Sequence, residues 1–176
     1  MANRILADAK VASAIELFEA WTEAQMAYRG QPGLSVGIVY DQALIWSRGF
    51  GCADLERQIP ATPATVYRIA SITKLFTSTA IMQLRDEGAL QLDDPVAKHL
   101  SWFSIRNPHA DRPPVTIRHL LTHAGGLPRE AAFPYWNTGE FPDAAAIRAA
   151  LRDQELPIPT ESDWKYSNLG MALAGE

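Results

Sequence analysis

A serine and a lysine stand three residues apart at the start of an apolar stretch, a spacing that can support nucleophilic catalysis. Ser71 and Lys74 belong to RIASITKLFTSTAIMQL, residues 68–84, and Lys74 carries the only charge between Ile72 and Leu84. On a helix, residues i and i+3 lie on neighbouring faces, so the hydroxyl and the amine can approach hydrogen-bonding distance. A serine becomes a good nucleophile when a base removes its proton. The pair is therefore a candidate nucleophile with its base.

A lysine amine acts as that base only where its surroundings suppress its charge. Burial penalises the ammonium form and lowers a lysine pKa from about 10.4 toward neutrality. A change of roughly 3 pKa units corresponds to about 4 kcal/mol, which we expect an apolar helix embedded in a core to impose. The structural alternative is that Ser71 caps the helix while Lys74 extends into solvent.

A second polar pair lies in WKYSNLG, residues 164–170. Tyr166 and Asn168 are two residues apart, so in an extended segment their side chains point the same way. A phenol beside an ammonium can lose or relay a proton, and a carboxamide can bind a substrate amide. The alternative is a packing role for Tyr166, with Asn168 as a helix cap.

In this order, Ser71-Ile72-Thr73-Lys74 and Tyr166-Ser167-Asn168 resemble the motifs of the serine β-lactamase and penicillin-binding-protein superfamily. The resemblance is to its class C-like branch, which includes esterases and D-amino-acid peptidases. It extends over residues 31–176 through VGIVYDQALIWSRGFGCADLE, LQLDDPVAKHL, TIRHLLTHAGGLP and YSNLGMALAGE. The sequence is therefore identified as a member of that superfamily, a β-lactamase-related serine hydrolase.

The resemblance implies a role for each residue of the two motifs. Ser71 would be the acylated nucleophile, with its backbone N–H as one oxyanion donor, and Lys74 its activating base or proton relay. Tyr166 would share the base role and protonate the leaving group, while Asn168 would contact both substrate and Lys74. The partner would be a small-molecule acyl substrate, namely a β-lactam, a D-amino-acid peptide or a small ester. Neither a cofactor nor a metal is implied.

The resemblance also implies an α/β (α+β) fold of the β-lactamase/transpeptidase type. Such a fold has an antiparallel sheet flanked by helices and carries an all-helical insert, here at about residues 88–159. The family's third motif, Lys-Thr-Gly or His-x-Gly, lies on a strand after Tyr-x-Asn and supplies the second oxyanion donor. His123-Ala124-Gly125 matches it in letters only, because it precedes Tyr166 and ends a predicted helix.

We therefore expect residues 1–176 to be the N-terminal part of such a domain, with its C-terminal strands missing. Exposed strand edges seek partners, so we expect association with the missing C-terminal half or self-association through those strands. We also expect these residues alone not to be a competent enzyme. The alternative is a catalytically silent acyl-binding or structural fragment.

Two further patterns suggest other chemistry. Gly33-Leu34-Ser35-Val36-Gly37 matches the G-x-S-x-G nucleophile elbow, which would make a conventional esterase using Ser35. That elbow needs a strand, a sharp turn and a helix, whereas Ser35 lies within a predicted strand that leads into a hairpin. His119 and His123 have the i, i+4 spacing of zinc ligands, but Leu120 follows where a metalloprotease needs a glutamate. We expect both patterns to be structural.

Periodicity and turn residues predict the elements that would position these groups. An amphipathic N-terminal helix ends at 31–33, and strands at 34–40 and 43–49 form a hairpin through Asp41 and Gln42. The helix that begins at Ser71 stops near Gly88. Further helices are predicted at 92–100, capped by Asp93 or Asp94; at 116–126, ended by Gly125 and Gly126; at 142–154; and from 168 onward.

Composition excludes several classes of function. The 176 residues suit one domain; 47% are hydrophobic and 20% charged, and the net charge is −4. Because no run of Lys or Arg occurs, we expect no nucleic-acid partner, and no apolar run is long enough to span a membrane. The N-terminus lacks an apolar signal core, so we expect a cytoplasmic protein, or a periplasmic or extracellular one if a leader was removed. The single cysteine, Cys52, excludes an internal disulfide.

Overall fold

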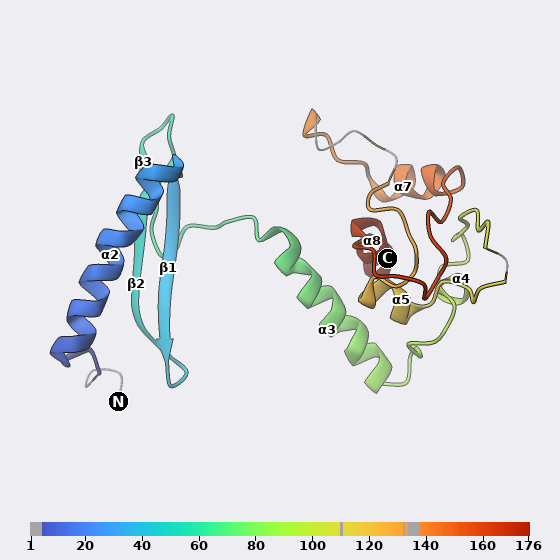
Figure 1. Cartoon of the computed structure of the whole chain (residues 1–176), viewed down its shortest axis with the longest axis horizontal. Coiled ribbons are helices and arrows are strands. Elements are labelled where there is room, and N and C mark those ends of the chain that lie inside the picture. Colours follow the sequence, from blue (N-terminus) through green and yellow to red (C-terminus); the bar gives the residue numbers. More distant parts are fainter. Residues whose placement is uncertain (1–4, 110, 132, 134–137) are drawn as a thin grey trace. The chain divides into compact units, whose positions relative to one another are not determined.

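The computed structural model describes residues 5–109, 111–131, 133 and 138–176, and the chain divides into two compact units (Figure 1). Met1–Arg68 form the first unit and Ile69–Glu176 form the second. Each unit is described separately below. Both motifs singled out from the sequence lie in the second unit.

The first unit consists of one helix and a small antiparallel sheet. Helix α2 (Ala9–Arg29) is followed by β1 (Gly33–Tyr40), β2 (Ala43–Asp54) and the two-residue β3 (Ile59–Pro60), with strand order β1-β2-β3. Asp41 and Gln42 join β1 to β2 with φ values of 49° and 61°. Two consecutive left-handed residues are typical of the tight hairpin turn that matches strand twist. The predicted hairpin is confirmed.

Helix α2 lies alongside the β1–β2 ribbon, as Figure 1 shows. The Phe18 ring of α2 meets the Trp46 ring of β2 edge-on, with centroids 6.0 Å apart. Arg48 of β2 forms ion pairs with Glu19 and Glu23, one helical turn apart on α2. An aromatic contact and a forked ion pair thus hold the helix against one strand.

The second unit is helical and has one apolar core. Its elements are η1 (Ala70–Ile72), α3 (Thr73–Asp86), α4 (Val96–His99), α5 (Ile117–Thr122), α7 (Ala144–Leu151) and α8 (Asn168–Gly175). Helix α8 contacts both α3 and α5, and its Leu169 and Leu173 are almost fully buried. Leu120 of α5 and Leu151 of α7 join the same core cluster. Packing of α8 between α3 and α5 brings the two sequence motifs near each other.

Helix α3 is exposed over much of its apolar surface. Ile81 is its only buried residue, whereas Leu75 and Phe76 are 67% and 66% exposed. Helix α8 contacts α3 within the second unit. A helix embedded in a core stays a prediction for the complete domain, in which further strands are expected to cover it.

The predicted side-chain cap of the helix at 92–100 is also wrong. Helix α4 begins after Pro95 and has no side-chain cap. Asp94 instead accepts hydrogen bonds from Gln91 N (2.9 Å), Lys98 Nζ (2.6 Å) and His99 Nε2 (2.8 Å). These bonds hold the pKa of the Asp94 carboxyl well below its usual range. The carboxylate therefore ties the loop before α4 to the side chains of Lys98 and His99 at the end of that helix, without capping its first turn.

Helix α5 ends earlier than predicted. Thr116 caps it, accepting from His119 N while its own N–H donates to His119 Nδ1. His123 then adopts φ 60°, and its N–H bonds to the carbonyl oxygen of His119. A left-handed residue ends a helix, so His123, and not Gly125, is the stop.

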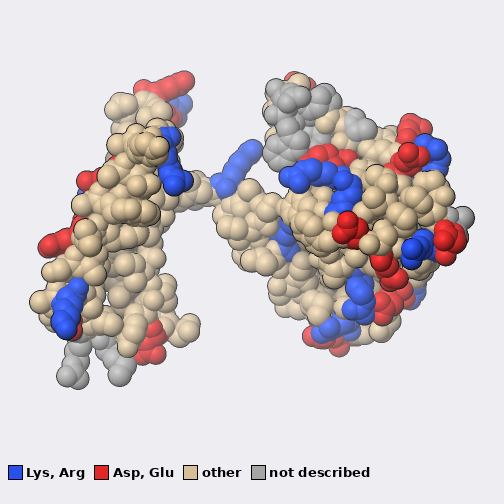
Figure 2. Space-filling model, in the orientation of Figure 1, with Lys and Arg blue, Asp and Glu red and all other residues tan. Residues whose placement is uncertain are grey.

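The predicted mixture of helices with an antiparallel sheet is confirmed. The proposed insert at 88–159 contains α4, α5 and α7, and its described residues include isolated bridge pairings but no strand. No helix in the described part of the chain combines the length and apolar character needed to cross a bilayer. Over the face of the second unit seen in Figure 2, acidic and basic side chains are interspersed without a continuous basic stripe.

Two glycines with left-handed backbones allow a matched test of the second unit. A Cβ at Gly126 (φ +68°) would collide with the carbonyl oxygen of Ile158, whereas a Cβ at Gly88 (φ +76°) would meet open space. We expect Gly88→Ala to lower the free energy of unfolding by about 1 kcal/mol from backbone strain alone. Gly126→Ala should cost about 2–3 kcal/mol because the neighbouring backbone must also move. Urea denaturation followed by circular dichroism measures both; equal losses would contradict this account of Gly126.

Candidate functional site

Ser71, Lys74, Tyr166 and Asn168 form one hydrogen-bonded cluster in the second unit. Lys74 Nζ donates to Ser71 Oγ at 3.1 Å and to Asn168 Oδ1 at 2.7 Å. The hydroxyls of Ser71 and Tyr166 are 2.8 Å apart. All four residues singled out from the sequence therefore meet, although 94 residues separate Lys74 from Asn168.

The backbone around Ser71 positions its hydroxyl for the cluster rather than for capping. Ser71 is the middle residue of η1, and Ala70 before it has φ 45°, an unusual conformation for a residue other than glycine. Helix α3 has no side-chain cap bond at its start. The alternative in which Ser71 caps the helix and Lys74 points to solvent is therefore wrong.

Ser167 anchors the second motif. Its Oγ accepts from Gly170 N at 2.8 Å and donates to Pro128 O at 2.6 Å, and the residue is 2% exposed. Asn168 N donates to Arg129 O at 2.8 Å. Because Ser167 and not Asn168 caps α8, the capping alternative for Asn168 is wrong and its carboxamide can reach Lys74.

Two cations lie against the Tyr166 ring. Lys74 Nζ is 4.9 Å from the ring centroid, and the Arg129 guanidinium carbon is 5.1 Å from it. The nearby Lys74 ammonium, together with the hydrogen bond from Ser71, lowers the pKa of the Tyr166 phenol below its ordinary value of 10.0. The phenolate form of Tyr166 is therefore more favoured in this site than in an isolated tyrosine.

Glu130 fixes the orientation of the Asn168 carboxamide. Asn168 Nδ2 donates to Glu130 Oε1 at 2.6 Å. A carboxylate only accepts hydrogen bonds, so the amide nitrogen must face Glu130 and the amide oxygen must face Lys74. Ser71, Tyr166 and Asn168 line an open pocket together with Arg129, Glu130 and Trp164.

Sequence reasoning missed Arg129, Glu130 and Trp164. Arg129 and Glu130 follow the phrase TIRHLLTHAGGLP with no motif of their own, and they reach the site through the folding of residues 124–130 back onto α8. Trp164 stands inside the quoted WKYSNLG, so proximity to Tyr166 was its only available signal. Its ring lies 6.2 Å from that of Tyr166.

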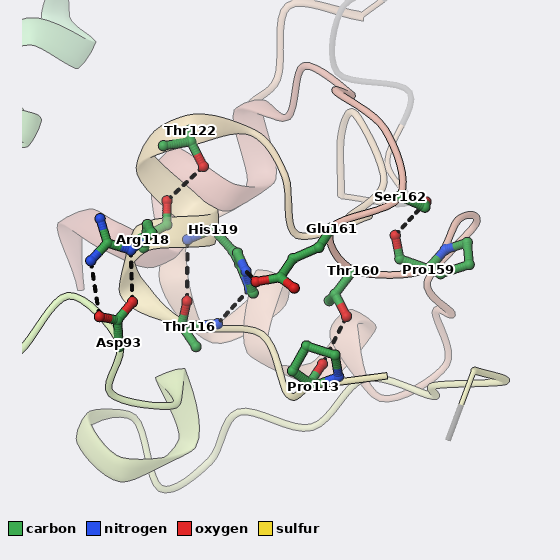
Figure 3. A network of polar contacts seen from close by, with 10 residues as sticks. All are labelled: Asp93, Pro113, Thr116, Arg118, His119, Thr122, Pro159, Thr160, Glu161 and Ser162. Atoms are coloured by element: carbon green, nitrogen blue, oxygen red, sulfur yellow. Dashed lines mark hydrogen bonds and ion pairs between the residues drawn. The ribbon is translucent and has the colours of Figure 1, made fainter. Parts of the chain in front are cut away.

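The two other candidate patterns have structural explanations. Ser35 lies within β1 and its Oγ bonds to Thr62 O at 2.6 Å and to the Tyr67 hydroxyl at 2.9 Å. The strand-turn-helix elbow is not formed there, as predicted. His119 Nδ1 accepts from Thr116 N, and its Nε2 lies 3.0 Å from Glu161 Oε1 (Figure 3).

His123 and His119 do not share one helical face, because His123 lies past the end of α5. The described residues contain no group of three or more His, Cys, Asp or Glu side chains placed to hold a metal ion.

Comparison with known proteins yields one family and many structural relatives. The family model described as Beta-lactamase matches residues 18–176. Protein flp of Staphylococcus aureus is 33% identical over 144 residues, covering 82% of this chain and 29% of flp. The octameric penicillin-binding protein homologue from Pyrococcus abyssi superposes with a TM-score of 0.80 at 36% identity, covering 92% of this chain and 37% of that one.

A further similar structure is EstCE1, described as a hydrolase with promiscuous acyltransferase activity. It superposes with a TM-score of 0.70 at 28% identity over 86% of this chain and 44% of its own. The β-lactamase/transpeptidase-like fold expected from the sequence is therefore confirmed. The chain spans under a third of flp and under half of each of the two structures.

The Tyr166 environment predicts a measurable coupling to Lys74. Lys74→Met removes the nearer cation, so the pKa of Tyr166 should rise toward its ordinary value. Alkaline titration of tyrosinate absorbance, with Tyr166→Phe subtracted to isolate this phenol among the five tyrosines, measures the pKa. Arg85→Met removes a cation from the far end of α3 and is the control. An equal rise in both variants would mean that Lys74 does not act locally.

Proposed function

The chain belongs to the beta-lactamase family, and on that premise we propose that it is a serine hydrolase in which Ser71 is acylated by a small carboxylic acid derivative. One observation carries the proposal: Ser71 Oγ lies within hydrogen-bonding distance of both Lys74 Nζ and the Tyr166 hydroxyl. A hydroxyl contacted by two groups able to move protons matches the requirement for an activated nucleophile.

The hydrogen bonds define a direction for the first proton transfer. Lys74 donates to Ser71 Oγ, which leaves the serine hydrogen to point at Tyr166. In its phenolate form, which the lowered pKa favours, Tyr166 accepts that proton as Oγ attacks the acyl carbon. Tyr166 then gives the proton to the leaving group and becomes a phenolate again, while the Lys74 ammonium stabilises the negative charge on Tyr166 and on Ser71 Oγ. Water later cleaves the serine ester and regenerates the Ser71 hydroxyl.

Asn168 has the remaining hydrogen-bonding capacity to hold a substrate. Lys74 occupies one lone pair of its Oδ1, and Glu130 accepts one hydrogen from its Nδ2. A carboxamide has a second lone pair and a second hydrogen. An acyl substrate carrying an amide can therefore bind Asn168 without displacing Lys74.

The start of α3 offers electrostatic help to the developing oxyanion. Ser71 lies two residues before Thr73, the first residue of this 14-residue helix, where the macrodipole places positive potential. We assign the Ser71 backbone N–H as one oxyanion donor, an interaction of the kind whose removal costs about 10²–10³ in rate. The substrate classes that we propose are β-lactams, D-amino-acid peptides and small esters.

The nucleophile can be identified by covalent labelling. We expect a fluorescent penicillin or a fluorophosphonate to label Ser71, because it alone among the described serines contacts both a lysine and a tyrosine. Ser71→Ala should abolish labelling, and Ser35→Ala should retain it. Peptide mass mapping locates the adduct. An adduct on Ser35 would overturn the assignment, and no adduct with either probe would indicate a catalytically silent acyl-binding or structural protein.

Substitutions at Lys74 test its part in proton movement. Lys74→Met should fold yet label Ser71 about 10²–10⁴-fold more slowly. Lys74→Arg should also fail, because the larger planar guanidinium cannot take the place of the ammonium between Ser71 Oγ and Asn168 Oδ1. The matched control is Lys98→Met, which removes an exposed lysine paired with Asp94. Near-normal labelling of Lys74→Met would contradict this role, because it would show that Tyr166 takes the Ser71 proton without help from Lys74.

A further inference from the structure

His123, at the end of α5, contacts the second motif directly. Its Nδ1 accepts a hydrogen bond from Ser167 N at 3.2 Å, and its ring lies 4.6 Å from the Tyr166 ring at a tilt of 39°. Its own carbonyl oxygen accepts from Lys165 N at 2.9 Å. One residue therefore touches the backbone on both sides of Tyr166 as well as the Tyr166 ring.

The bond to Ser167 requires a neutral imidazole. A backbone N–H can only donate, so Nδ1 must carry a lone pair and the ring proton must sit on Nε2. Protonation of the ring turns Nδ1 into a donor and sets two N–H groups against each other. It also places a cation next to Tyr166, whose ring already faces the Lys74 ammonium and the Arg129 guanidinium.

We propose that neutral His123 is a positioning residue that holds Tyr166 and Asn168 in register with Ser71, and that protonation of its ring releases this segment and switches the site off. The proposal rests on the serine-hydrolase function proposed above. His123 acts through Ser167 and Tyr166, and it carries no proton in the reaction itself.

Two features show that the hydrogen bond between Ser167 N and His123 Nδ1 affects the geometry of the site. Ser167 is the residue between Tyr166 and Asn168, so a shift of its N–H moves both side chains that meet Ser71 and Lys74. The ring is also held in place, because the left-handed backbone of His123 fixes its direction at the end of α5 and the Trp164 ring stands edge-on at 5.9 Å.

The groups around His123 favour its neutral form. Burial and the positive charge of Lys74 on α3 lower the pKa of His123 below its ordinary value of 6.5. Arg129 lies over the Tyr166 ring, and the backbone N–H of Lys165 donates to the carbonyl oxygen of His123. Of the two acids in the 161–167 segment, Glu161 is paired with His119 on α5 and Asp163 accepts a hydrogen bond from Trp164 N, while Glu130 bonds to Asn168.

The sign of the pH dependence follows from that lowered pKa. The unfolded chain binds a proton at His123 more readily than the folded chain does, so the contribution to stability is complete above about pH 6.5. This contribution is lost as the pH falls from about 6.5 through the pKa that His123 has in the folded chain. The site should therefore be assembled at neutral pH and released in acid.

His123→Asn separates positioning from titration. Asparagine tolerates the left-handed backbone, and its Oδ1 can take the place of Nδ1 as the acceptor for Ser167 N–H while being unable to titrate. His123→Ala removes the acceptor in the same backbone. His99→Asn, which removes a histidine paired with Asp94 on α4, is the control.

The first measurement is the rate of Ser71 labelling by the penicillin or fluorophosphonate probe between about pH 8 and pH 5. The quantity compared is the wild-type rate divided by the His123→Asn rate at the same pH. This ratio should be about one at neutral pH and should fall by about tenfold per pH unit below the His123 pKa. His99→Asn should follow wild type, and His123→Ala should be slow throughout. A ratio of wild type to His123→Asn that stays constant with pH overturns the proposal.

The second measurement needs no enzymatic activity. In nitrogen-15 NMR, the Ser167 amide proton and the His123 ring nitrogens of wild type should shift together with a single midpoint below pH 6.5. Separate midpoints, or an unshifted Ser167 amide, overturn the positioning role. If no variant labels at any pH while these signals titrate together, the proposed hydrolase function has failed and the coupling of His123 to Ser167 stands.

Discussion

The candidate site depends on the placement of one ammonium group. Lys74 Nζ donates to Ser71 and Asn168 and faces the Tyr166 ring, so each of the other three side chains takes its orientation partly from this charge. The same charge lowers the pKa of Tyr166. A cation in this position polarises the serine hydroxyl and favours the phenolate that can accept its proton. The site is therefore best understood as a cation-centred cluster with the serine at one edge.

The second constraint is how the chain holds the two halves of that cluster together. Ser71 and Lys74 are three residues apart and are set by the turn into α3, whereas Tyr166 and Asn168 arrive from far along the chain. The loop that follows α5 fixes this second half, since its backbone and side chains bond to Ser167 and Asn168 at four points. Buried bonds of this kind are costly to break, so the loop sets the precision of the site.

The exposure of α3 affects the role expected for Lys74 in the proton transfer. The sequence argument relied on a helix buried in the complete domain to suppress the charge of Lys74, whereas Leu75 and Phe76, which directly follow Lys74, are largely exposed here. The neighbours of Lys74 in the second unit are polar acceptors, which suit an ammonium. Within this unit the physical argument for proton acceptance therefore rests more on Tyr166 than the sequence suggested.

The sequence by itself determined the hairpin, most of the helices, the family and the four residues of the cluster, because local spacing and turn residues carry that information. It placed the cap of α4 and the end of α5 wrongly, since the Asp94 side chain bonds to Gln91, Lys98 and His99 rather than capping the helix, and His123 turns out of α5 to meet Ser167. Only the tertiary structure revealed Arg129, Glu130 and His123 at the site. Arg129 and Glu130 have no periodic or motif signature, and the patterns that include His123 suggested other roles for it. Each acts through contact with residues about 40 positions away. Such contacts depend on how α5 and α8 pack against each other, and the sequence of a short segment does not determine that packing.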